Sequence, residues 1–313
     1  MISIDVEEEG LFCGRYPRVP PGVTNVAELR RLEFISRDFG FPLTLLVSYR
    51  VAQDPAACRV LAHWRDRYGA EIGVHLHHWN TPPFQDLPHP EPVPAENLDR
   101  ALLRDKIARL INQVQGALGA TPRAFRMGRF DIGPQVLGLL PELGLTVDSS
   151  VVPLSPKSAA PGHFLAPPDP FWLPGDGVLE VPLTMMPVLA GTPELACQLA
   201  AALPPAWGRR LLDRFRSVAA VGVQPAWYPL PSMRWAVRLH RCRGGRALNM
   251  FLHSSELQPG ASRFFPTEAA VGRLMARLRA FLAWLVKTGP VEGVTLSGLR
   301  EEWLRDGRPG PPQ

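Results

Sequence analysis

Acidic side chains alternate at the end of the first apolar segment of the chain, where residues 2–6 have the composition of a β-strand. Asp5 and Glu7 stand two positions apart, so a strand would place both carboxylates on the same side. Two carboxylates in that position can share a cation. Glu8 and Glu9 follow at once, and these residues taken alone favour a solvated acidic turn over a shared cation.

Three histidines occur within four positions of the segment 71–80. His75 and His77 end an apolar strand candidate and share one face of it, whereas His78 points to the opposite side. A single histidine is more often a core residue, but three at this spacing favour a cluster of ligands for a divalent ion. Two imidazoles and one carboxylate leave coordination positions open for water and substrate, as a catalytic metal site requires.

Arginines and a carboxylate follow the next two strand candidates. Arg126 and Arg129 flank Gly128, a residue that lets the backbone come close to a ligand. Arg126 is placed to hold a catalytic carboxylate, although an ordinary surface arginine would look the same. Asp148 precedes two serines in a pattern that is also a common turn. We expect Arg129 and Asp148 to contact substrate.

A further histidine follows the apolar residues 250–252. His253 stands just past this strand candidate, and Glu256 lies in the loop that follows. An imidazole with an unperturbed, near-neutral pKa can protonate a departing amine, whereas a solvated acid is already ionised. We therefore predict that His253 is a proton donor, with a core histidine as the alternative, and we place Glu256 among the substrate contacts.

Short apolar segments alternate with segments of helical period, which is the pattern of βα units around a mainly parallel sheet. The strand candidates are residues 2–6, 43–48, 71–77, 124–127, 146–148, 178–183, 247–253 and 294–296. The helix candidates are residues 25–38, 55–68, 96–118, 134–143 and 268–287, the last behind a Thr267 cap. Seven or eight strands in this order predict an α/β fold whose barrel has its chemistry at the carboxyl ends of the strands.

The segment from about 191 to 246 interrupts this alternation and predicts a helical, arginine-rich insertion over that face, within one domain spanning 1–313. The chain carries a formal charge of +5 and is 46% hydrophobic. Its basic residues are scattered, which is not typical of a nucleic-acid-binding arm, although the basic stretch 207–246 is compatible with a phosphate or lipid-headgroup contact. No apolar run reaches the roughly 20 residues of a membrane span, and no leader is evident. We expect a cytoplasmic protein.

The four cysteines lie too far apart for a structural zinc site or a disulfide scaffold. We expect Cys13, Cys58, Cys197 and Cys242 to be free buried thiols in a reducing compartment.

These five chemistry-bearing segments, in this order, resemble the motifs of the NodB-type polysaccharide deacetylase superfamily. The closest resemblance is to its WalW-like branch, which has an Asp-Val-Glu opening and a His-Leu-His segment. The resemblance extends from Asp5 to Glu256 and the helix behind it. It implies an incomplete or distorted (β/α) barrel, with Asp5 as catalytic base, Glu7 as metal ligand and His75 as another ligand.

The sequence departs from the superfamily pattern at two positions. The usual pair of histidines four residues apart is broken by Trp79, which leaves His77 or His78 as the second imidazole ligand. We choose His77 because of the strand geometry. Gly128 stands where a proline is common. The resemblance further implies that Arg126 orients the base and that His253 is the proton donor.

The resulting hypothesis is a metal-dependent hydrolase that removes an N-acetyl group from an N-acetylated sugar or saccharide precursor by means of metal-activated water. The expected ion is Zn²⁺, held by Glu7, His75 and His77. Trp79, Phe84 and Trp172 are candidates for stacking on sugar rings. Two alternatives remain, namely an amidohydrolase acting on a non-sugar C–N bond and a degenerate deacetylase fold that binds a glycan or a protein partner.

Overall fold

Eight strands form one curled sheet in the order β10-β1-β2-β3-β4-β5-β7-β6. The structure is a computed structural model that describes residues 1–11, 18, 22–86, 93–156, 163–173 and 177–306. The strands are β1 (Ile2–Val6), β2 (Thr44–Val47), β3 (Glu71–Leu76), β4 (Ala124–Met127), β5 (Val147–Asp148), β6 (Phe171–Trp172), β7 (Leu179–Glu180) and β10 (Met250–His253). All neighbours pair in parallel except β6 and β7. The predicted incomplete, distorted (β/α) barrel is therefore confirmed.

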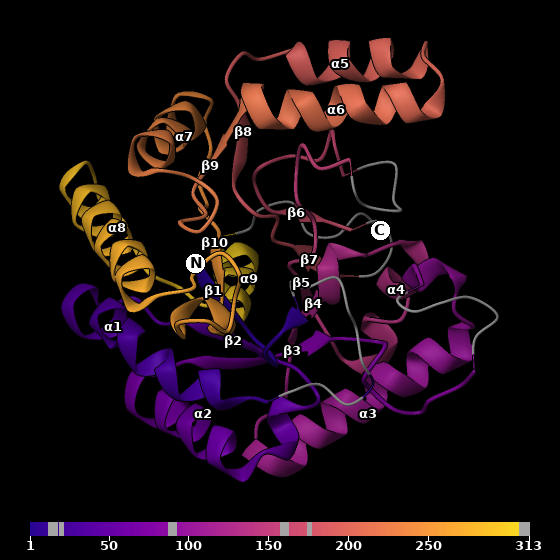
Figure 1. The fold of residues 1–313 in the computed structure, drawn as a ribbon, viewed down its shortest axis with the longest axis vertical. Helices are drawn as coiled ribbons and strands as arrows, with labels where there is room; N and C mark the ends of the chain where they lie inside the picture. Colours follow the sequence, from indigo (N-terminus) through magenta and orange to yellow (C-terminus); the bar gives the residue numbers. More distant parts are fainter. Residues whose placement is uncertain (12–17, 19–21, 87–92, 157–162, 174–176, 307–313) are drawn as a thin grey trace.

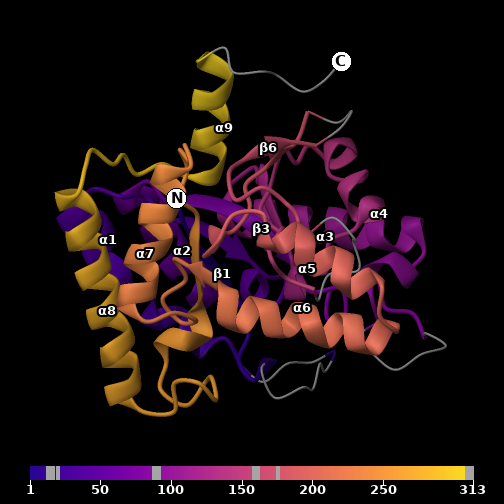
Figure 2. The same ribbon diagram turned by 90° about the horizontal axis from the view of Figure 1, so that it is seen from above.

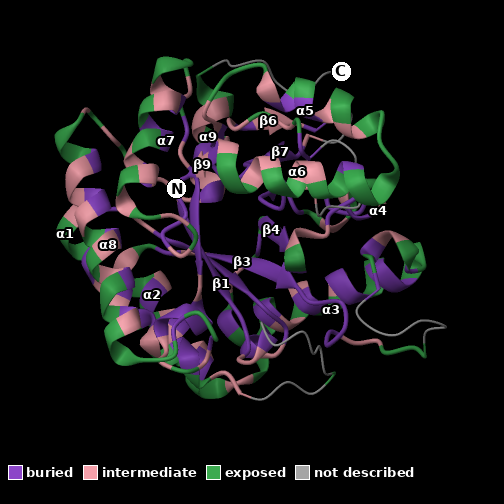
Figure 3. Ribbon diagram, turned by 45° about the horizontal axis from the view of Figure 1, so that its top comes forward, coloured by how far each residue is buried: buried purple, intermediate pink, exposed green. Residues whose placement is uncertain are grey.

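Helices surround this sheet and shield its outer side from solvent (Figure 1). They include α1 (Glu33–Phe39), α2 (Pro55–Tyr68), α3 (Arg100–Leu118), α4 (Pro134–Leu137), α7 (Leu230–Cys242), α8 (Glu268–Lys287) and α9 (Leu296–Arg305). Side chains cap several of them: Asp54 begins α2, Asp99 begins α3, and the predicted Thr267 cap begins α8. Buried residues are concentrated in the strands and on the inward faces of the helices (Figure 3).

The predicted strand 294–296 is wrong. Thr295 caps α9 there by accepting a hydrogen bond from the backbone N–H of Gly298, and the helix starts at Leu296. Leu296 and Leu299 are buried beneath the sheet, in a cluster with Leu46 and Val147. The apolar character of this segment therefore comes from burial of the first turn of a helix.

Three predicted helices differ in detail from those observed. The segment 96–118 begins in the separate 3₁₀-helix η4 (Ala95–Asn97) and is α-helical only from Arg100. The segment 25–38 begins as the 3₁₀-helix η2 (Thr24–Leu32) and becomes α-helical only in α1. The segment 134–143 divides into the short α4 and the 3₁₀-helix η6 (Pro141–Leu143). The two-residue strand β6 and the hairpin of β8 (Met185–Pro187) with β9 (Ala220–Gly222) were not predicted, because segments this short leave no periodic pattern.

The segment 191–246 is mainly helical, as predicted. Its helices α5 (Thr192–Ala201) and α6 (Pro205–Ala219) lie side by side (Figures 1 and 2). They pack on the chain that follows β5, where Phe164 contacts Phe215 with ring centroids 5.6 Å apart. The third helix, α7, packs instead against α8. That this segment is an insertion within a single domain stays a prediction.

Candidate metal and proton-transfer site

The carboxyl ends of β1, β3, β4 and β10 bring four of the predicted residues together. In the register of the sheet, Asp5 lies beside His253 of β10, and His75 lies beside Arg126 of β4. Parallel pairing puts the carboxyl ends of these strands at one end of the sheet, and strand alternation points the four side chains to the same face. Asp5, His75 and Arg126 are each at most 2% exposed.

A candidate metal site is formed by Glu7, His75 and His77, whose ligand atoms lie within 4.8 Å of one another. The two Nε2 atoms are 2.9 Å apart, and Glu7 Oε2 lies 3.4 Å from that of His75 and 3.3 Å from that of His77. Ligand atoms of a tetrahedral zinc ion with bonds of about 2.0–2.1 Å are separated by roughly 3.3 Å. The spacing of the three ligand atoms therefore fits such an ion.

The hydrogen bonds behind the imidazoles settle which nitrogens face the site. His75 Nδ1 lies 3.1 Å from the backbone oxygen of Arg126, and His77 Nδ1 lies 2.7 Å from Glu8 Oε1. Both oxygens only accept, so each Nδ1 carries a hydrogen, and in the neutral form of each ring, the form that binds a metal, the lone pair is on Nε2. Two lone pairs and the Glu7 carboxylate, whose Oε1 has no hydrogen-bond partner, then converge. This donor set is suited to a cation.

The electrostatics of the site agree with this geometry. Burial alone would lower the pKa of His77, but the carboxylates of Glu8 and Glu7 outweigh it and raise that pKa to about 10. Burial would raise the pKa of Glu7, but His253, His75 and His77 hold it well below its usual range. Without an ion, His77 therefore carries a proton on Nε2 as well as on Nδ1, and a cation bound between these side chains would replace the Nε2 proton.

His78 lies outside this group. It is 3% exposed, and burial together with the nearby Lys106 lowers its pKa to about 3. Of these two histidines, His77 and not His78 belongs to the group with Glu7 and His75. That His77 is the second imidazole ligand stays a prediction.

Arg126 and Asp5 form a fully buried ion pair beside the candidate metal site. Arg126 Nη1 donates to Asp5 Oδ1 over 2.5 Å, and its Nη2 donates to the hydroxyls of Ser3 and Ser149 over 2.8 and 2.7 Å. Its Nε donates to the backbone oxygen of Ser149 over 2.7 Å. These bonds fix one Asp5 oxygen and leave Oδ2 facing His75 Nε2 at 4.0 Å and His253 Nε2 at 3.9 Å.

Glu256 binds both the backbone and the ring of His253, and its contact with substrate stays a prediction. Its Oε2 accepts from the His253 backbone N–H and its Oε1 lies near the ring Nδ1, both at 3.1 Å. Burial would lower the pKa of His253, but Glu7, Glu256 and Asp5 raise it to about 9. The imidazole is therefore protonated at neutral pH, with Nε2 directed toward Asp5.

Two other expected substrate contacts are buried. Trp79 is 2% exposed and stacks on the His77 ring, with centroids 4.5 Å apart. Gly128 makes room for this stack, since a Cβ there would lie 2.6 Å from His77 Cδ2 and 3.1 Å from Trp79. Asp148 is fully buried and accepts a hydrogen bond from Ser150 over 2.6 Å. These positions are explained by packing behind the site.

Arg129 is exposed beyond β4, with a backbone φ of 62°. Of the predicted stacking residues, Phe84 is 45% exposed, whereas Trp172 packs under Arg300 of α9, near the amino ends of the strands. Arg129 and Phe84 therefore stay open to solvent, and Trp172 lies away from the site.

Sequence reasoning missed Glu8 and Asn249. Glu8 stands in an acidic run and is fully buried against His77. Asn249 Nδ2 donates to Ser149 Oγ over 2.9 Å and so supports the hydroxyl that binds Arg126. The only signal for Asn249 was its place two residues before the apolar Phe251, on the same strand face as His253.

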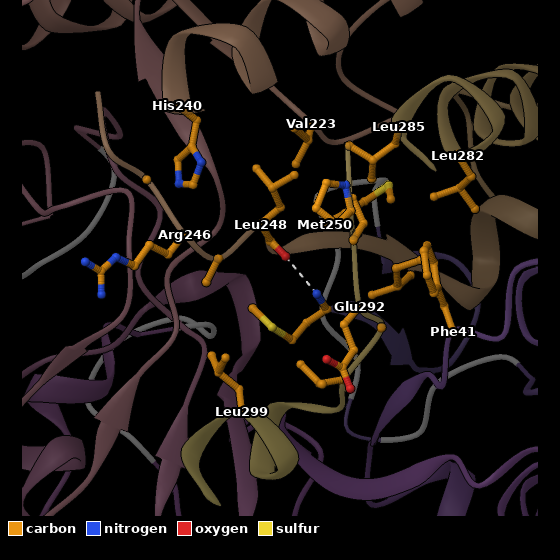
Figure 4. A pocket seen from close by; sticks show the side chains of 18 of the residues that line it. Phe41, Val223, His240, Arg246, Leu248, Met250, Leu282, Leu285, Glu292 and Leu299 are labelled. Carbon is orange, nitrogen blue, oxygen red and sulfur yellow. Dashed lines mark hydrogen bonds between the residues drawn. The ribbon is translucent and has the colours of Figure 1, made fainter. Parts of the chain in front are cut away.

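A separate cavity of about 250 Å³ lies at the other end of the sheet (Figure 4). It is lined by the beginnings of β1 and β10 and by Leu282 and Leu285 of α8. The buried carboxylates and imidazoles therefore do not belong to it.

Comparisons with known proteins identify a solved structure with the same fold. No protein-family model and no curated protein sequence matches the chain. A solved structure of a candidate polysaccharide deacetylase from Mycobacterium smegmatis matches with a TM-score of 0.55 and 20% identity, over 92% of this chain and 80% of that one. This chain therefore has the fold of that protein, and at such low identity the likeness shows the fold alone.

Two further structures match less well. A family 4 acetyl xylan esterase from Clostridium thermocellum, solved with a cobalt ion, matches at a TM-score of 0.43 with 17% identity, over 98% of this chain and 91% of that one. A family 4 carbohydrate esterase from Streptomyces lividans, solved with acetate, matches at 0.41 with 15% identity, over 90% and 88%. Likenesses at this level establish neither relationship nor activity.

The cysteines and the helices bear on two remaining predictions. Cys58 and Cys197 are half-buried and Cys242 is exposed, all as free thiols, so the expectation of buried thiols is wrong for these three. Cys13 lies outside the described residues. Among the described segments, no helix combines the length and apolar character needed to cross a bilayer.

Proposed function

We propose that this protein is a metal-dependent hydrolase that removes the acetyl group from an N-acetylated saccharide. The observation that carries the proposal is the convergence of Glu7 Oε2 with the Nε2 lone pairs of His75 and His77 in the interior. The same end of the sheet supplies a carboxylate, Asp5, and a protonated imidazole, His253. Amide hydrolysis needs both kinds of proton-transfer group.

The metal would be held by Glu7, His75 and His77, and zinc suits their mixture of imidazole and carboxylate donors. When bound, a divalent ion polarises the amide carbonyl and lowers the pKa of water at the site. Glu8 and the Arg126 carbonyl orient the two imidazoles by binding their Nδ1 hydrogens.

Two side chains of this protein, Asp5 and His253, carry out the proton transfers. Asp5 accepts a proton from the attacking water through Oδ2, the oxygen that Arg126 does not bind. Arg126 holds Asp5 in place through a charge-assisted hydrogen bond to Oδ1. His253 donates a proton from Nε2 to the nitrogen that leaves, so that water and amide yield acetate and a free amine.

An N-acetylated sugar is the proposed substrate class, on two grounds. The motif resemblance implies it, and the protein whose fold is shared is a candidate polysaccharide deacetylase. The WalW-like branch and the cytoplasmic location stay predictions from the sequence.

The test is acetate release from N-acetylglucosamine and chitobiose by the zinc-loaded protein. Asp5→Asn and His253→Ala are compared with Asp66→Asn and His63→Ala, which change exposed residues of α2. We expect turnover in wild type and in both α2 variants, with loss in the two site variants. Equal turnover in all five proteins would refute the assigned roles.

The same samples distinguish an active hydrolase from a protein that binds metal or glycan without catalysis. If the wild type retains stoichiometric zinc and releases no acetate from either sugar or from a simple N-acetyl amide, the metal site stands and the hydrolase proposal fails. Release only from the simple amide would favour the alternative of a non-sugar substrate.

A further inference from the structure

The helices α5 and α6 present apolar side chains to solvent at one end of the molecule. Figure 1 shows the pair at the end opposite α2 and α3. Leu195 and Leu199 of α5 are more than half exposed, and so are Trp207 and Val218 of α6. Single exposed apolar residues are common on protein surfaces, but a group of them on two adjacent helices indicates a contact surface.

The exposed leucines lie on the flank of the helix pair that faces away from the rest of the protein. The opposite flank borders a cavity of about 380 Å³, which Cys197 and Leu212 line together with the chain after β5. Residues two positions apart in an α-helix point in nearly opposite directions. Leu195 and Leu199 each stand two positions from Cys197. Arg214 stands two positions from Leu212, so the leucines and Arg214 point away from the cavity on the same side of the pair.

Arginines alternate with apolar side chains on this flank of α6. One row along the helix, with intervals of three or four residues, consists of Trp207, Arg210, Arg214 and Val218. The Arg210 guanidinium lies over the Trp207 ring at 5.3 Å. Both arginines are exposed, and neither forms an ion pair with a carboxylate of the described residues. Residues 192–219 contain four arginines and two acids, so the helix pair offers uncompensated positive charge to a partner.

The mixture of leucine, tryptophan and arginine favours a lipid bilayer as that partner. Apolar side chains of a basic amphipathic helix enter the boundary between headgroups and acyl chains, and its arginines bind lipid phosphates. A nucleic acid would match the arginines but leave the leucines without apolar contacts. A second copy of the chain, related by a twofold axis, would bring the same uncompensated arginines into one interface.

We propose that the outer flank of α5 and α6, formed by Leu195, Leu199, Trp207, Arg210 and Arg214, docks on an anionic lipid membrane. In this arrangement both helices lie parallel to the bilayer, with the apolar side chains among the upper acyl chains and the guanidiniums at the phosphates. The inference goes beyond the proposed function and does not depend on it, because neither metal nor catalysis takes part in the contact.

The experiment is co-sedimentation of the full-length protein with sucrose-loaded vesicles. One set contains equal parts of phosphatidylglycerol and phosphatidylcholine, and the other contains phosphatidylcholine alone. We expect partitioning onto the anionic vesicles to be at least about tenfold stronger, because two arginines near an anionic surface together contribute more than that factor. High salt should weaken this binding. Equal partitioning onto both kinds of vesicle, or onto neither, would overturn the inference.

Charge variants assign the binding to α6. Arg210→Gln combined with Arg214→Gln should reduce partitioning onto the anionic vesicles about tenfold. The matched control combines Arg104→Gln with Arg109→Gln, which changes exposed arginines of α3, and should bind nearly as the wild type does. If the two double variants partition equally, the positive charge of α6 is not what binds the membrane, and the inference fails.

Apolar variants test insertion into the bilayer. Leu195→Ser combined with Leu199→Ser should reduce partitioning at least about tenfold, the factor expected for loss of one buried leucine side chain. Val286→Ser combined with Leu304→Ser changes exposed apolar residues of α8 and α9 and should bind as the wild type does. All four positions are exposed, so circular dichroism should match the wild type. Wild-type binding by the α5 variant would contradict insertion.

Trp207 reports the contact directly. Vesicles with brominated acyl chains should quench part of the tryptophan emission of the wild type. Trp207→Leu keeps an apolar side chain, so it should still bind the vesicles but lose that quenching. Unchanged quenching in Trp207→Leu would show that another surface faces the bilayer and would overturn the inference.

Sedimentation velocity without vesicles tests the second copy as the alternative occupant. A wild-type dimer that Leu195→Ser with Leu199→Ser converts to a monomer, in a protein that binds no vesicles, would assign the outer flank to self-association and overturn the membrane contact. Because acetate release is not measured in any of these experiments, their failure leaves the proposed hydrolase standing, and an inactive protein can still bind the vesicles.

Discussion

The Nδ1 hydrogen of His77 is bound by the fully buried carboxylate of Glu8 at 2.7 Å, so the ring's Nε2 lone pair faces Glu7 and His75. This contact explains how the adjacent residues Glu7 and Glu8 have different roles. Glu7 faces the candidate ion, and Glu8, on the other side of the strand, orients one of its ligands.

Replacing Glu8 should weaken metal binding without removing a ligand. In Glu8→Gln the amide no longer offers a charged acceptor to His77, and we expect zinc affinity to fall about 10- to 100-fold. Competition with a chromogenic chelator measures this. Glu9→Gln is the matched control from the same acidic run, since Glu9 binds Thr24 and Asn25 instead. Equal affinities in the two variants would contradict the role given to Glu8.

Asp5→Asn should abolish proton acceptance while leaving the metal in place. Because Asp5 is outside the Glu7, His75 and His77 group, zinc content should stay stoichiometric. We expect kcat for acetate release to fall by roughly 10²- to 10⁴-fold, the usual contribution of a general base. Loss of zinc together with activity would show that Asp5 is a ligand instead.

The pH dependence of acetate release should follow the protonation of His253, and replacing Glu256 should shift it. The protonated imidazole donates the proton, so activity should fall as pH rises through the pKa of His253, which the neighbouring carboxylates raise to about 9. Glu256→Gln removes one of those negative charges and should shift the alkaline limb to lower pH. A divalent ion beside Glu7 opposes part of the upward shift in both proteins, so their difference isolates Glu256. An unshifted limb would assign the proton donation elsewhere.

Acid sensitivity of the fold should come partly from His163. Burial lowers its pKa to about 4, so the folded protein keeps it neutral where the unfolded chain, with a pKa near 6.5, takes up a proton. Its contribution to stability is therefore complete above pH 6.5 and is lost as pH falls toward 4, by up to about 2 kcal/mol between pH 6.5 and 5. Urea unfolding at both pH values should show a smaller difference in the free energy of unfolding for His163→Gln than for the wild type. An equal difference would exclude His163 as a source.

Much of the site was predictable because strand ends carry a strong local pattern. Apolar segments that end in Asp5, His75 or His253 place polar groups at one edge of a parallel sheet, and strand alternation separated His77 from His78. Strand alternation predicts the direction in which a side chain points but does not predict whether that side chain is buried. It could not show that Glu8, on the far side of the strand, would find His77, or that Trp79 would pack behind that ring.

Local hydrogen bonds and burial beneath the sheet account for two other differences between prediction and structure. Glu256 is three residues from His253 and turns back to bind it, which a strand-and-loop pattern does not distinguish from a solvent-facing acid. The segment 294–296 has strand-like composition, but the Thr295 cap and the space beneath the sheet favour a helix. The two hydrogen bonds are local, whereas the burial of Leu296 beneath the sheet depends on neighbours far away in sequence.

The most direct measurement is anomalous X-ray diffraction at the zinc edge from crystals of the zinc-loaded protein. The proposed coordination predicts one strong peak within about 2.0–2.2 Å of a Glu7 oxygen and of the Nε2 atoms of His75 and His77. A crystal that binds zinc only elsewhere, or whose peak is coordinated by His78 instead of His77, would contradict it.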